Sequence, residues 1–384
     1  MMRFICAMFL AFYAAMAFAH KASDSYLTIT PDDAVAHIDG QWDIALRDLD
    51  FAMGIDADGD GEITWGEVKA QHERIAAYAL ARLSLRLAGG ICPLRVVEHL
   101  IDEHSDGSYA VIRFTATCSQ PRGRLDRLDI EYRALFDLDA QHRGLLRFTH
   151  AGATRSAILS PEQPTVTFAL HDGATPTSGR WAEFSQFVQE GVRHIWIGFD
   201  HILFLLSLLL PAVLVLRSRI WQPVAAFRLA GWDVLAIVTS FTIAHSITLT
   251  LATLEVVTLP SRFVESVIAI SVVLAAANNV YPLVDRARWA VAFVFGLIHG
   301  FGFATVLGEL GLRSSTLLIA LVGFNIGVEI GQLAIVLVFL PIAYWLRATW
   351  MYRRMVVLGG SVAIMLIAAV WFCERAFNLA LWPV

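Results

Sequence analysis

The second half of the chain holds six long apolar segments, and they constrain its fold more than any other feature. An α-helix needs about 20 mostly apolar residues to cross the ~30 Å hydrocarbon core of a bilayer. The segments of suitable length cover residues 192–216, 230–254, 263–283, 289–310, 315–346 and 355–373. We therefore expect an all-α transmembrane bundle of six helices within residues 186–384, in contact with a lipid bilayer.

Composition separates the two halves of the chain. The 384 residues are 57% hydrophobic and 16% charged, whereas soluble proteins average about 25% charged residues. Residues 20–190 carry 16 basic and 26 acidic side chains, and residues 191–384 carry 12 Arg, no Lys and 8 acidic side chains. The hydrophobicity excludes a disordered chain, and the absence of a basic domain argues against a nucleic-acid partner.

Residues 1–19 have the features of a secretory signal peptide. Arg3 precedes an apolar run, and the small residues Ala17 and Ala19 are placed for cleavage before His20. An uncleaved first transmembrane helix is the alternative. After cleavage, the terminal amine and the imidazole of His20 would offer two nitrogens to Cu²⁺ or Ni²⁺, which makes His20 a candidate N-terminal metal site.

The distribution of Arg, like the signal peptide, favours an orientation with residues 20–185 outside the membrane. With residues 20–185 outside, the loops and tail on the outer side contain Arg262, Arg313 and Arg375. The loops on the inner side contain Arg217, Arg219, Arg228, Arg286, Arg288, Arg347, Arg353 and Arg354. This bias follows the positive-inside rule. It predicts a bacterial inner-membrane protein whose N-terminal domain lies in the periplasm.

Residues 20–185 are expected to form a β-rich domain with one helix. Apolar and polar residues alternate in residues 26–30, 34–38, 94–99, 109–115, 128–135, 145–150 and 165–170, as is typical of strands. The pairs Asp39-Gly40, Asp106-Gly107 and Asp172-Gly173 predict turns. We expect the helix to span Trp65 to Leu87, with Gly89-Gly90 as its stop signal.

The stretch from Asp56 to Glu67 matches the EF-hand calcium loop. Carboxylates occupy positions 1, 3 and 5, Gly61 occupies position 6 and a glutamate occupies position 12. The candidate ligands for a structural Ca²⁺ are Asp56, Asp58, Asp60, Glu62, Thr64 and Glu67. The alternative is an acidic turn that only caps the following helix.

Cys92 and Cys118 are the only cysteines in residues 20–185. In an exported domain such a pair is expected to form a disulfide. Two free buried thiols are the alternative.

Ionisable residues are expensive inside a membrane and are candidates for function. The predicted helices contain six of them that could meet: His194, Asp200, His201, His245, His299 and Glu329. Counted from the outer end of each helix, His201, His245, His299 and Glu329 lie about 14–21 Å deep. Three imidazoles with carboxylates suit Ni, Co, Cu or Zn. Hydrogen bonding between helices, without a metal, is the alternative.

Small and polar residues accompany this set. Thr242, Ser246, Asn325 and Gln332 are candidates for orienting the ligands. Two groups of glycines are expected to allow close helix packing: Gly323, Gly327 and Gly331 in one segment, and Gly296, Gly300 and Gly302 in another.

These motifs resemble HupE/UreJ membrane proteins, and most closely the branch with an exported N-terminal domain. The resemblance covers about residues 190–375. It rests on His194-x5-Asp200-His201, Phe241-Thr242-x2-His245-Ser246, the run from His299 to Ala304, and the run from Phe324 to Gln332. Phe303 stands where the family suggests a further His. The resemblance implies a permease for nickel or cobalt.

Together these features predict a protein that binds and transports a divalent transition metal of the nickel, cobalt or copper class. His194 would capture the metal at the outer end, and Asp200, His201, His245, His299 and Glu329 would form the inner site. An intramembrane metal-dependent hydrolase, with Ser246 and Glu329 in catalysis, is a less favoured alternative. A third reading is an assembly factor that delivers metal to a partner in metalloenzyme maturation.

Overall fold

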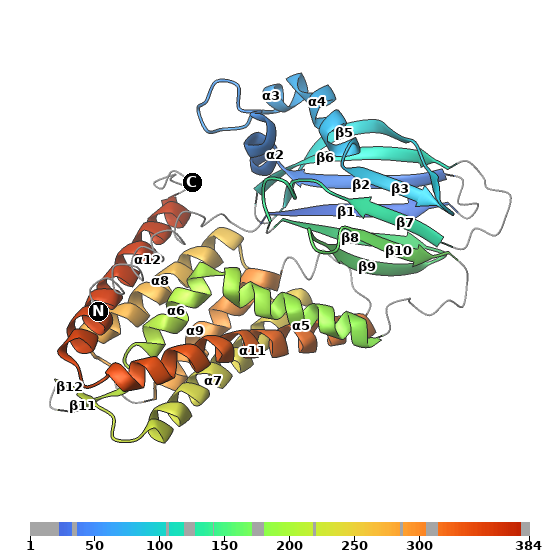
Figure 1. The fold of residues 1–384 in the computed structure, drawn as a ribbon. Helices are drawn as coiled ribbons and strands as arrows, with labels where there is room; N and C mark the ends of the chain where they lie inside the picture. The colour runs from blue at the N-terminus through green and yellow to red at the C-terminus, as the bar shows by residue number, and fades with distance from the viewer. Residues whose placement is uncertain are drawn as a thin grey trace. The chain divides into compact units, whose positions relative to one another are not determined.

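The computed structural model divides the chain into two compact units, one up to Gly179 and one from Arg180 (Figure 1). It describes residues 23–32, 37–104, 107–118, 127–140, 142–170, 180–217, 220–284, 287–304 and 314–377. The signal peptide, His20 and the Asp172-Gly173 turn lie outside the described residues.

The first unit is built from two β-sheets that share one core. The larger sheet has the strand order β5-β6-β2-β1-β8-β9 and the smaller has the order β10-β7-β3-β4. Strands β1 and β8 pair in parallel, whereas the other paired strands run antiparallel. The bounds are β1 (Asp24–Pro31), β2 (His37–Ala45), β3 (Leu83–Leu87), β4 (Gly90–Ile91), β5 (Leu94–His104), β6 (Gly107–Thr117), β7 (Arg127–Tyr132), β8 (Arg143–His150), β9 (Ala153–Leu159) and β10 (Thr165–Ala169).

Aromatic side chains join the two sheets. Trp42 of β2 packs on Tyr132 of β7 with ring centroids 5.2 Å apart, and Phe148 of β8 stacks on Phe168 of β10 at 4.3 Å. Each of these rings is at least nine-tenths buried. Burial of such side chains is the main favourable term in folding, so the β-rich unit has a core of its own.

The expected turn at Asp39-Gly40 is wrong. Strand β2 continues through both residues, and Gly40 pairs with Ile29 on one side and Phe114 on the other. A Cβ at Gly40 would lie 2.2 Å from the ring of Phe114. The glycine therefore provides space for an aromatic ring inside the sheet, and does not mark a turn.

The single helix expected from Trp65 to Leu87 is also wrong. Two short helices, α3 (Trp65–Ala70) and α4 (His72–Leu80), are followed by strand β3. Leu83, Leu85 and Leu87 are buried on one side of this strand, which is the period of two expected for a strand. Gly89 lies in the β3–β4 turn with φ +85°, and Gly90 begins β4.

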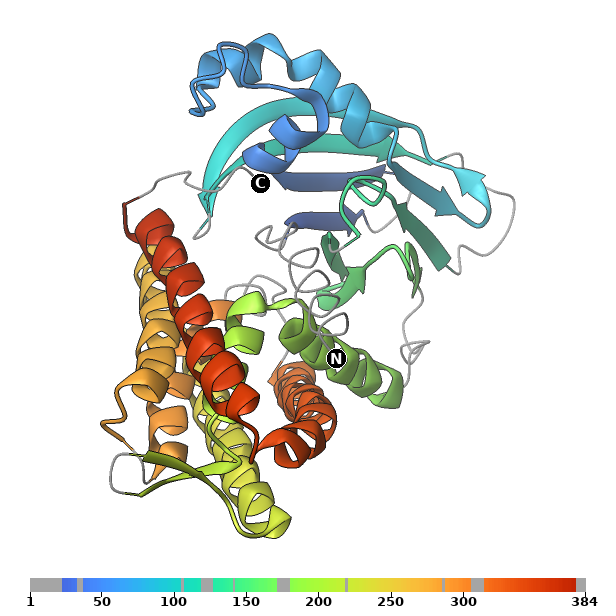
Figure 2. The ribbon, with the colours of Figure 1, turned by 60° about the vertical axis from the view of Figure 1, so that its left-hand side comes forward.

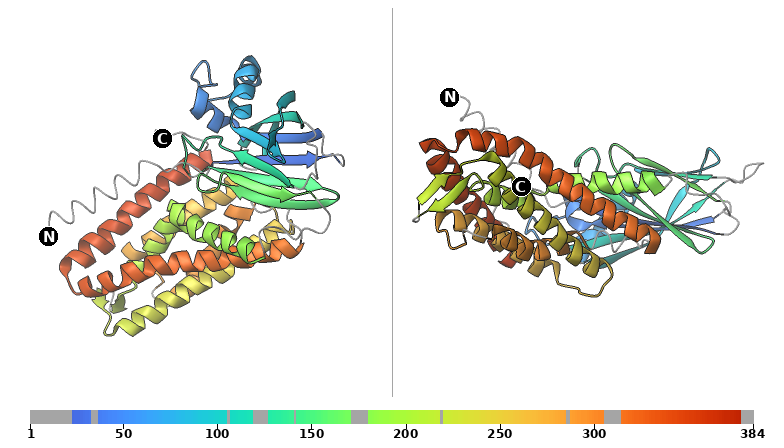
Figure 3. Two further views of the ribbon diagram at one scale, coloured as in Figure 1. Left: turned by 45° about the vertical axis from the view of Figure 1, so that its right-hand side comes forward. Right: turned by 90° about the horizontal axis from the view of Figure 1, so that it is seen from below.

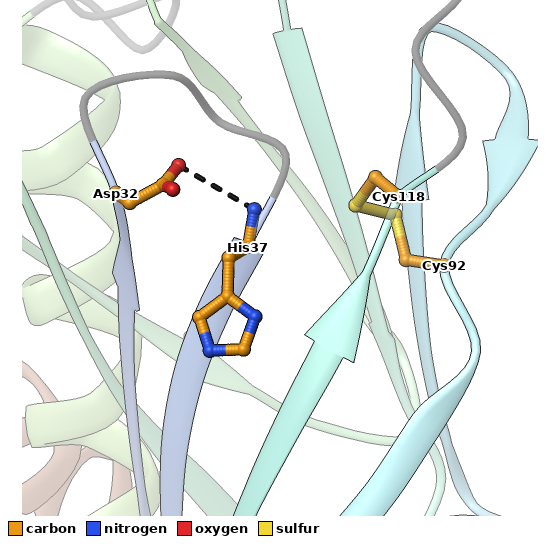
Figure 4. The surroundings of a disulfide bond; sticks show 4 residues. All are labelled: Asp32, His37, Cys92 and Cys118. Atoms are coloured by element: carbon orange, nitrogen blue, oxygen red, sulfur yellow. Dashed lines mark hydrogen bonds between the residues drawn. A yellow bond between two sulfur atoms is a disulfide. The ribbon is translucent and has the colours of Figure 1, made fainter.

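The predicted disulfide is confirmed. Cys92 and Cys118 are bonded and buried, and they join the chain after β4 to the end of β6 (Figure 4). On the neighbouring strands, the backbone N–H of His37 donates to Asp32 at 3.4 Å. The bridge ties together segments from both sheets of the unit.

The second unit is mainly helical. Its helices are α5 (Arg180–Ile197), α6 (Phe199–Leu209), α7 (Phe227–Thr253), α8 (Ser261–Val280), α9 (Arg288–His299), α11 (Ser314–Leu346) and α12 (Gly360–Phe377). A 3-10 turn, η2 (Gly300–Phe303), extends α9, and a π-helical segment, η3 (Tyr352–Gly359), leads into α12. A short hairpin of β11 (Leu214–Arg217) and β12 (Ile220–Pro223) follows α6.

Four of the described helices are long and apolar enough to cross a membrane, and the bent pair of α5 and α6 is a fifth candidate. The four are α7, α8, the part of α11 from Leu317, and the helix from Tyr352 to Phe377. The expected continuous first helix is wrong, because α5 and α6 meet at 71° and a hairpin strand occupies its last residues. Of the fourth expected segment, the residues that the structure describes contain a shorter apolar helix, Arg288–Phe303.

Glycines bring the helices into close contact. Figure 2 shows α5 and α11 side by side, and a Cβ at Gly327 would lie 2.1 Å from the carbonyl oxygen of Val188. Gly300 likewise lies against His245 and Thr248 of α7. The packing role expected for these glycines is therefore observed. Helices α8 and α12 also run together (Figure 3).

Candidate metal site

The site begins at the break between α5 and α6. Gly198 separates the two helices, and a Cβ at this position would lie 2.8 Å from both the carbonyl oxygen of His194 and Nδ1 of His201. Only glycine leaves this space open. The bend therefore lets the histidine at the end of α5 and the histidine at the start of α6 face one another, with ring centroids 4.5 Å apart.

A third imidazole, from α7, completes a histidine trio of His194, His201 and His245. The His245 ring lies 6.1 Å from that of His194 and 6.3 Å from that of His201, between centroids. One ring nitrogen from each residue lies within 4.8 Å of the other two. Residues 51 positions apart in the chain are thus close enough for small side-chain movements to bring their nitrogens onto one ion, at the Zn–N distance of about 2.0–2.1 Å.

Each histidine of the trio leaves a buried Nε2 without a hydrogen-bond partner. Buried polar atoms in proteins are nearly always satisfied, so an exception needs an explanation. Here three exceptions belong to residues that converge on one point. This pattern fits a site whose partner is an ion.

The other ring nitrogen is held by a neighbouring acceptor in two of the three residues. Nδ1 of His201 donates to Oδ1 of Asp200 at 3.0 Å. Nδ1 of His245 donates to Oδ1 of Asn325, on α11, at 3.3 Å. Because Nδ1 carries the proton, Nε2 keeps its lone pair, which is the tautomer a metal ligand requires.

His299, the fourth predicted histidine, lies beside the trio and outside the group whose nitrogens are within 4.8 Å. Its ring centroid is 5.0 Å from that of His201. Ser271 of α8 donates to the carbonyl of Ile268, so its oxygen accepts from Nε2–H of His299 at 3.0 Å. The buried Nδ1 of His299 is then a further unpartnered acceptor.

The two predicted carboxylates are engaged differently. Oδ1 of Asp200 accepts both the backbone N–H and the ring N–H of His201, at 2.9 and 3.0 Å. Oε1 of Glu329 accepts from the hydroxyl of Thr239, on α7, at 2.9 Å. Asp200 therefore orients a histidine, and Glu329 lies outside the group of mutually close ligand atoms.

The remaining predicted polar residues link α7 to α11 or bond within α7. The hydroxyl of Thr242 donates to Gln332 at 3.4 Å, and that of Ser246 donates to the carbonyl of Thr242 at 2.6 Å. Of the four residues expected to orient ligands, Asn325 is the one that forms a hydrogen bond with an imidazole of the trio.

Sequence reasoning missed the aromatic residues around the trio and two hydroxyls. Phe303 and Phe324 stack on each other at 4.3 Å, and both lie against His194, at 4.9 and 5.3 Å. Phe241 lies 5.9 Å from His245. Ser271 and Thr239 sit in apolar stretches, where nothing in the local pattern marks them.

The loop from Asp56 to Glu67 connects α2 (Leu46–Met53) to α3. Carboxylate oxygens of Asp56, Asp58 and Glu67 lie within 4.8 Å of one another. Gly59 and Gly61 have φ +72° and +84°, and their N–H groups donate to Asp56 at 2.7 and 2.9 Å. The loop thus brings three of its acidic side chains together, whereas the predicted ligands Asp60 and Glu62 are exposed and outside this group.

The helix-capping alternative for this loop is also observed. Thr64 and Glu67 form a capping box, in which the Glu67 carboxylate accepts the backbone N–H of Thr64 at 2.8 Å. Hydrogen bonds from the backbone N–H groups of Thr64 and Ala57 lower the pKa of Glu67. The carboxylate is therefore ionised and points into the loop, which suits either role.

Comparison with known families identifies the helical unit. The family described as HupE / UreJ protein matches residues 171–375, more than half of the chain. The chain belongs to this family of membrane proteins, which is associated with the uptake of nickel and cobalt. A search of curated proteins gave no match.

Proposed function

We propose that the helical unit binds a transition-metal cation at the histidine trio and carries it across the membrane. The observation that carries the proposal is that three histidines, each with a buried Nε2 that has no partner, bring one ring nitrogen apiece within 4.8 Å of one another. Leaving three acceptors unpaired in an apolar surrounding costs free energy. A cation that accepts the three lone pairs compensates for that cost, and the family association supports transport.

The geometry favours transport over hydrolysis. A hydrolytic site needs a base or nucleophile within reach of metal-bound water. Ser246 donates to its own helix and Glu329 accepts from Thr239. Among the described residues, both catalytic candidates therefore have other partners. Delivery of the metal to a maturation partner remains compatible with transport and concerns the step after release.

The proposal places the β-rich unit in the periplasm and the cleavage site before His20. The Cys92–Cys118 bridge supports this placement, since disulfides persist in oxidising compartments. The bias of Arg toward the loops on the opposite side supports it too.

We also propose that the loop from Asp56 to Glu67 binds a structural Ca²⁺. The support is the EF-hand spacing together with the three carboxylates that already point at one another. A loop without a second, paired loop is expected to bind weakly, with Kd about 10⁻⁴–10⁻³ M as in extracellular modules.

Uptake by vesicles tests the transport proposal directly. Purified protein in liposomes should accelerate entry of Ni²⁺, Co²⁺ or Zn²⁺, and His201→Ala and His245→Ala should remove the acceleration. Trp196→Ala is the control. It removes an exposed side chain from the helix that carries His194, and the hydrogen bond that it removes is the one from the indole N–H to the carbonyl of Gly331. Metal binding without any accelerated entry would overturn transport and leave a binding or delivery role.

A further inference from the structure

Two aromatic rings border the histidine trio at His194. Phe303 stacks on Phe324 at 4.3 Å with the ring planes 7° apart. We call these two residues the phenylalanine pair. The pair contacts His194 directly, and Phe324 also lies 6.3 Å from His245.

A third ring also lies beside the trio. Phe241, one turn before His245 on α7, lies 6.2 Å from His201 and 5.9 Å from His245. Phe241 and Phe324 are almost fully buried. The three imidazoles are thus set among hydrocarbon surfaces that offer a metal no lone pair.

Most polar groups close to the trio are already used, and the unpartnered Nδ1 of His299 is the exception. Asp200 and Asn325 accept from the imidazoles themselves, and Glu329 accepts from Thr239. A water bound to the metal on the side of the phenylalanine pair would face carbon and find few hydrogen-bond partners, which is costly.

We propose that the phenylalanine pair limits the coordination number of the bound cation to about four, so that the trio selects a tetrahedral cation of the Zn²⁺ type over Ni²⁺. Three imidazole nitrogens and one small ligand satisfy Zn²⁺, which is almost always tetrahedral in such sites. Ni²⁺ prefers square-planar or tetragonal geometry and gains less from three nitrogens on one side. This inference rests on the proposed function and specifies its substrate.

The experiment uses Co²⁺ as a spectroscopic probe of full-length protein in detergent. Four-coordinate tetrahedral Co²⁺ gives intense visible bands, whereas six-coordinate Co²⁺ gives weak ones. We expect intense bands for the unaltered protein, and Zn²⁺ should displace Co²⁺ at concentrations about tenfold or more below those needed for Ni²⁺.

Three variants test whether the phenylalanine pair sets the coordination of the bound cation. Phe303→His adds a nitrogen at the pair and should weaken the bands and reduce the preference for Zn²⁺ over Ni²⁺. Phe303→Leu keeps the surface apolar and should preserve both. Phe295→His is the matched control. It makes the same substitution outside the phenylalanine pair, at a ring of α9 that contacts Phe204 at 5.8 Å.

The outcomes separate the two proposals. Weak bands in the unaltered protein, or equal displacement by Ni²⁺ and Zn²⁺, would overturn the inference while leaving the metal site intact. An unchanged spectrum in a folded Phe303→His protein would overturn it as well. Loss of the bands in His201→Ala is required, and Co²⁺ binding that survives this change would refute the trio itself.

Discussion

Both units bury histidines, but they satisfy them differently. His142 in the β-rich unit is fully buried, and both of its ring nitrogens are used: Nδ1 lies 2.5 Å from Oγ of Ser23 and Nε2 lies 2.5 Å from the hydroxyl of Tyr132. His201 and His245 in the helical unit are equally buried, and each uses Nδ1 alone.

His142 lies within a chain of hydrogen bonds in which each of its ring nitrogens has a partner. Ser23 donates to Asp48 and so accepts from Nδ1–H of His142, whose Nε2 accepts from Tyr132. Tyr132 in turn lies 2.6 Å from Ser25, whose oxygen accepts from the indole of Trp42. A fully satisfied network stabilises a fold. The comparison therefore separates a structural histidine from one that has a lone pair to offer.

Removal of a trio histidine should give the largest effect. Changing even a residue that only orients a ligand costs about 10–100-fold in metal affinity, so loss of a ligand in His245→Ala should lower affinity by more than this range. His142→Ala should leave metal content unaltered and destabilise the β-rich unit instead. Metal-to-protein ratios measured by elemental analysis decide this. Equal metal loss in both variants would remove the distinction.

Acidification should destabilise the β-rich unit through His142. Burial lowers the pKa of His142 to about 3, whereas the unfolded chain has a pKa of about 6.5. Below pH 6.5 the unfolded state binds a proton that the folded state does not. The contribution of neutral His142 to the free energy of unfolding is therefore fully present above that pH. It falls as the pH drops toward 3, by about 2 kcal/mol between pH 7 and 5.

The loss of stability at low pH can be measured by hydrogen exchange in full-length protein. The rates in peptides from β2 and β7 are compared after correction for intrinsic exchange. The His142→Gln variant supplies the control, since it should be less stable at pH 7 and show a smaller slope. If the stability of the unaltered protein fell with pH no more steeply than that of the variant, the role of His142 would be contradicted.

Residues that hold the trio should have smaller effects than the ligands. Asn325→Leu removes the acceptor of His245 Nδ1–H and should weaken metal binding about tenfold. Gln332→Leu should weaken it less, because Gln332 accepts from the hydroxyl of Thr242 and not from a ligand. Titration of both variants with Co²⁺ or Zn²⁺ compares them. A larger loss in Gln332→Leu would show that the assignment of these two residues is reversed.

Calcium should give the smallest effect, and it should be confined to the β-rich unit. Binding to the folded state alone stabilises by about 1.4 kcal/mol at a tenfold excess over Kd. Exchange in peptides from α2 to α4 should slow at millimolar Ca²⁺. Glu67→Gln should abolish this slowing, whereas Glu62→Gln should preserve it, since position 7 binds through its backbone carbonyl. No slowing in the unaltered protein would leave Glu67 as a helix cap alone.

Local patterns predicted much of the β-rich unit. The strands around Tyr26, Val111 and Leu146 follow from alternation, and the disulfide follows from cysteine count and export. The errors arose where a local signal had a tertiary cause. Gly40 suggested a turn, but it is in a strand because the ring of Phe114 occupies the space of its missing side chain.

The helical unit shows the same limit. Hydropathy located each apolar segment, yet it could not show that the first one bends by 71° at Gly198. A hydropathy average does not register one glycine. The need for a glycine at the bend comes from His194, Asp200 and His201, whose atoms occupy the space next to Gly198.

The sequence by itself determined that polar residues of the right chemistry lie within membrane helices, because their positions in apolar segments are visible by counting. Only the tertiary structure decided which of them meet. His194, His201 and His245 converge, whereas Glu329 bonds to Thr239 and Phe303 packs against His194. The physical reason is that depth depends on position along a helix, whereas contact depends on how each helix is rotated and bent, and packing against neighbouring helices sets that rotation.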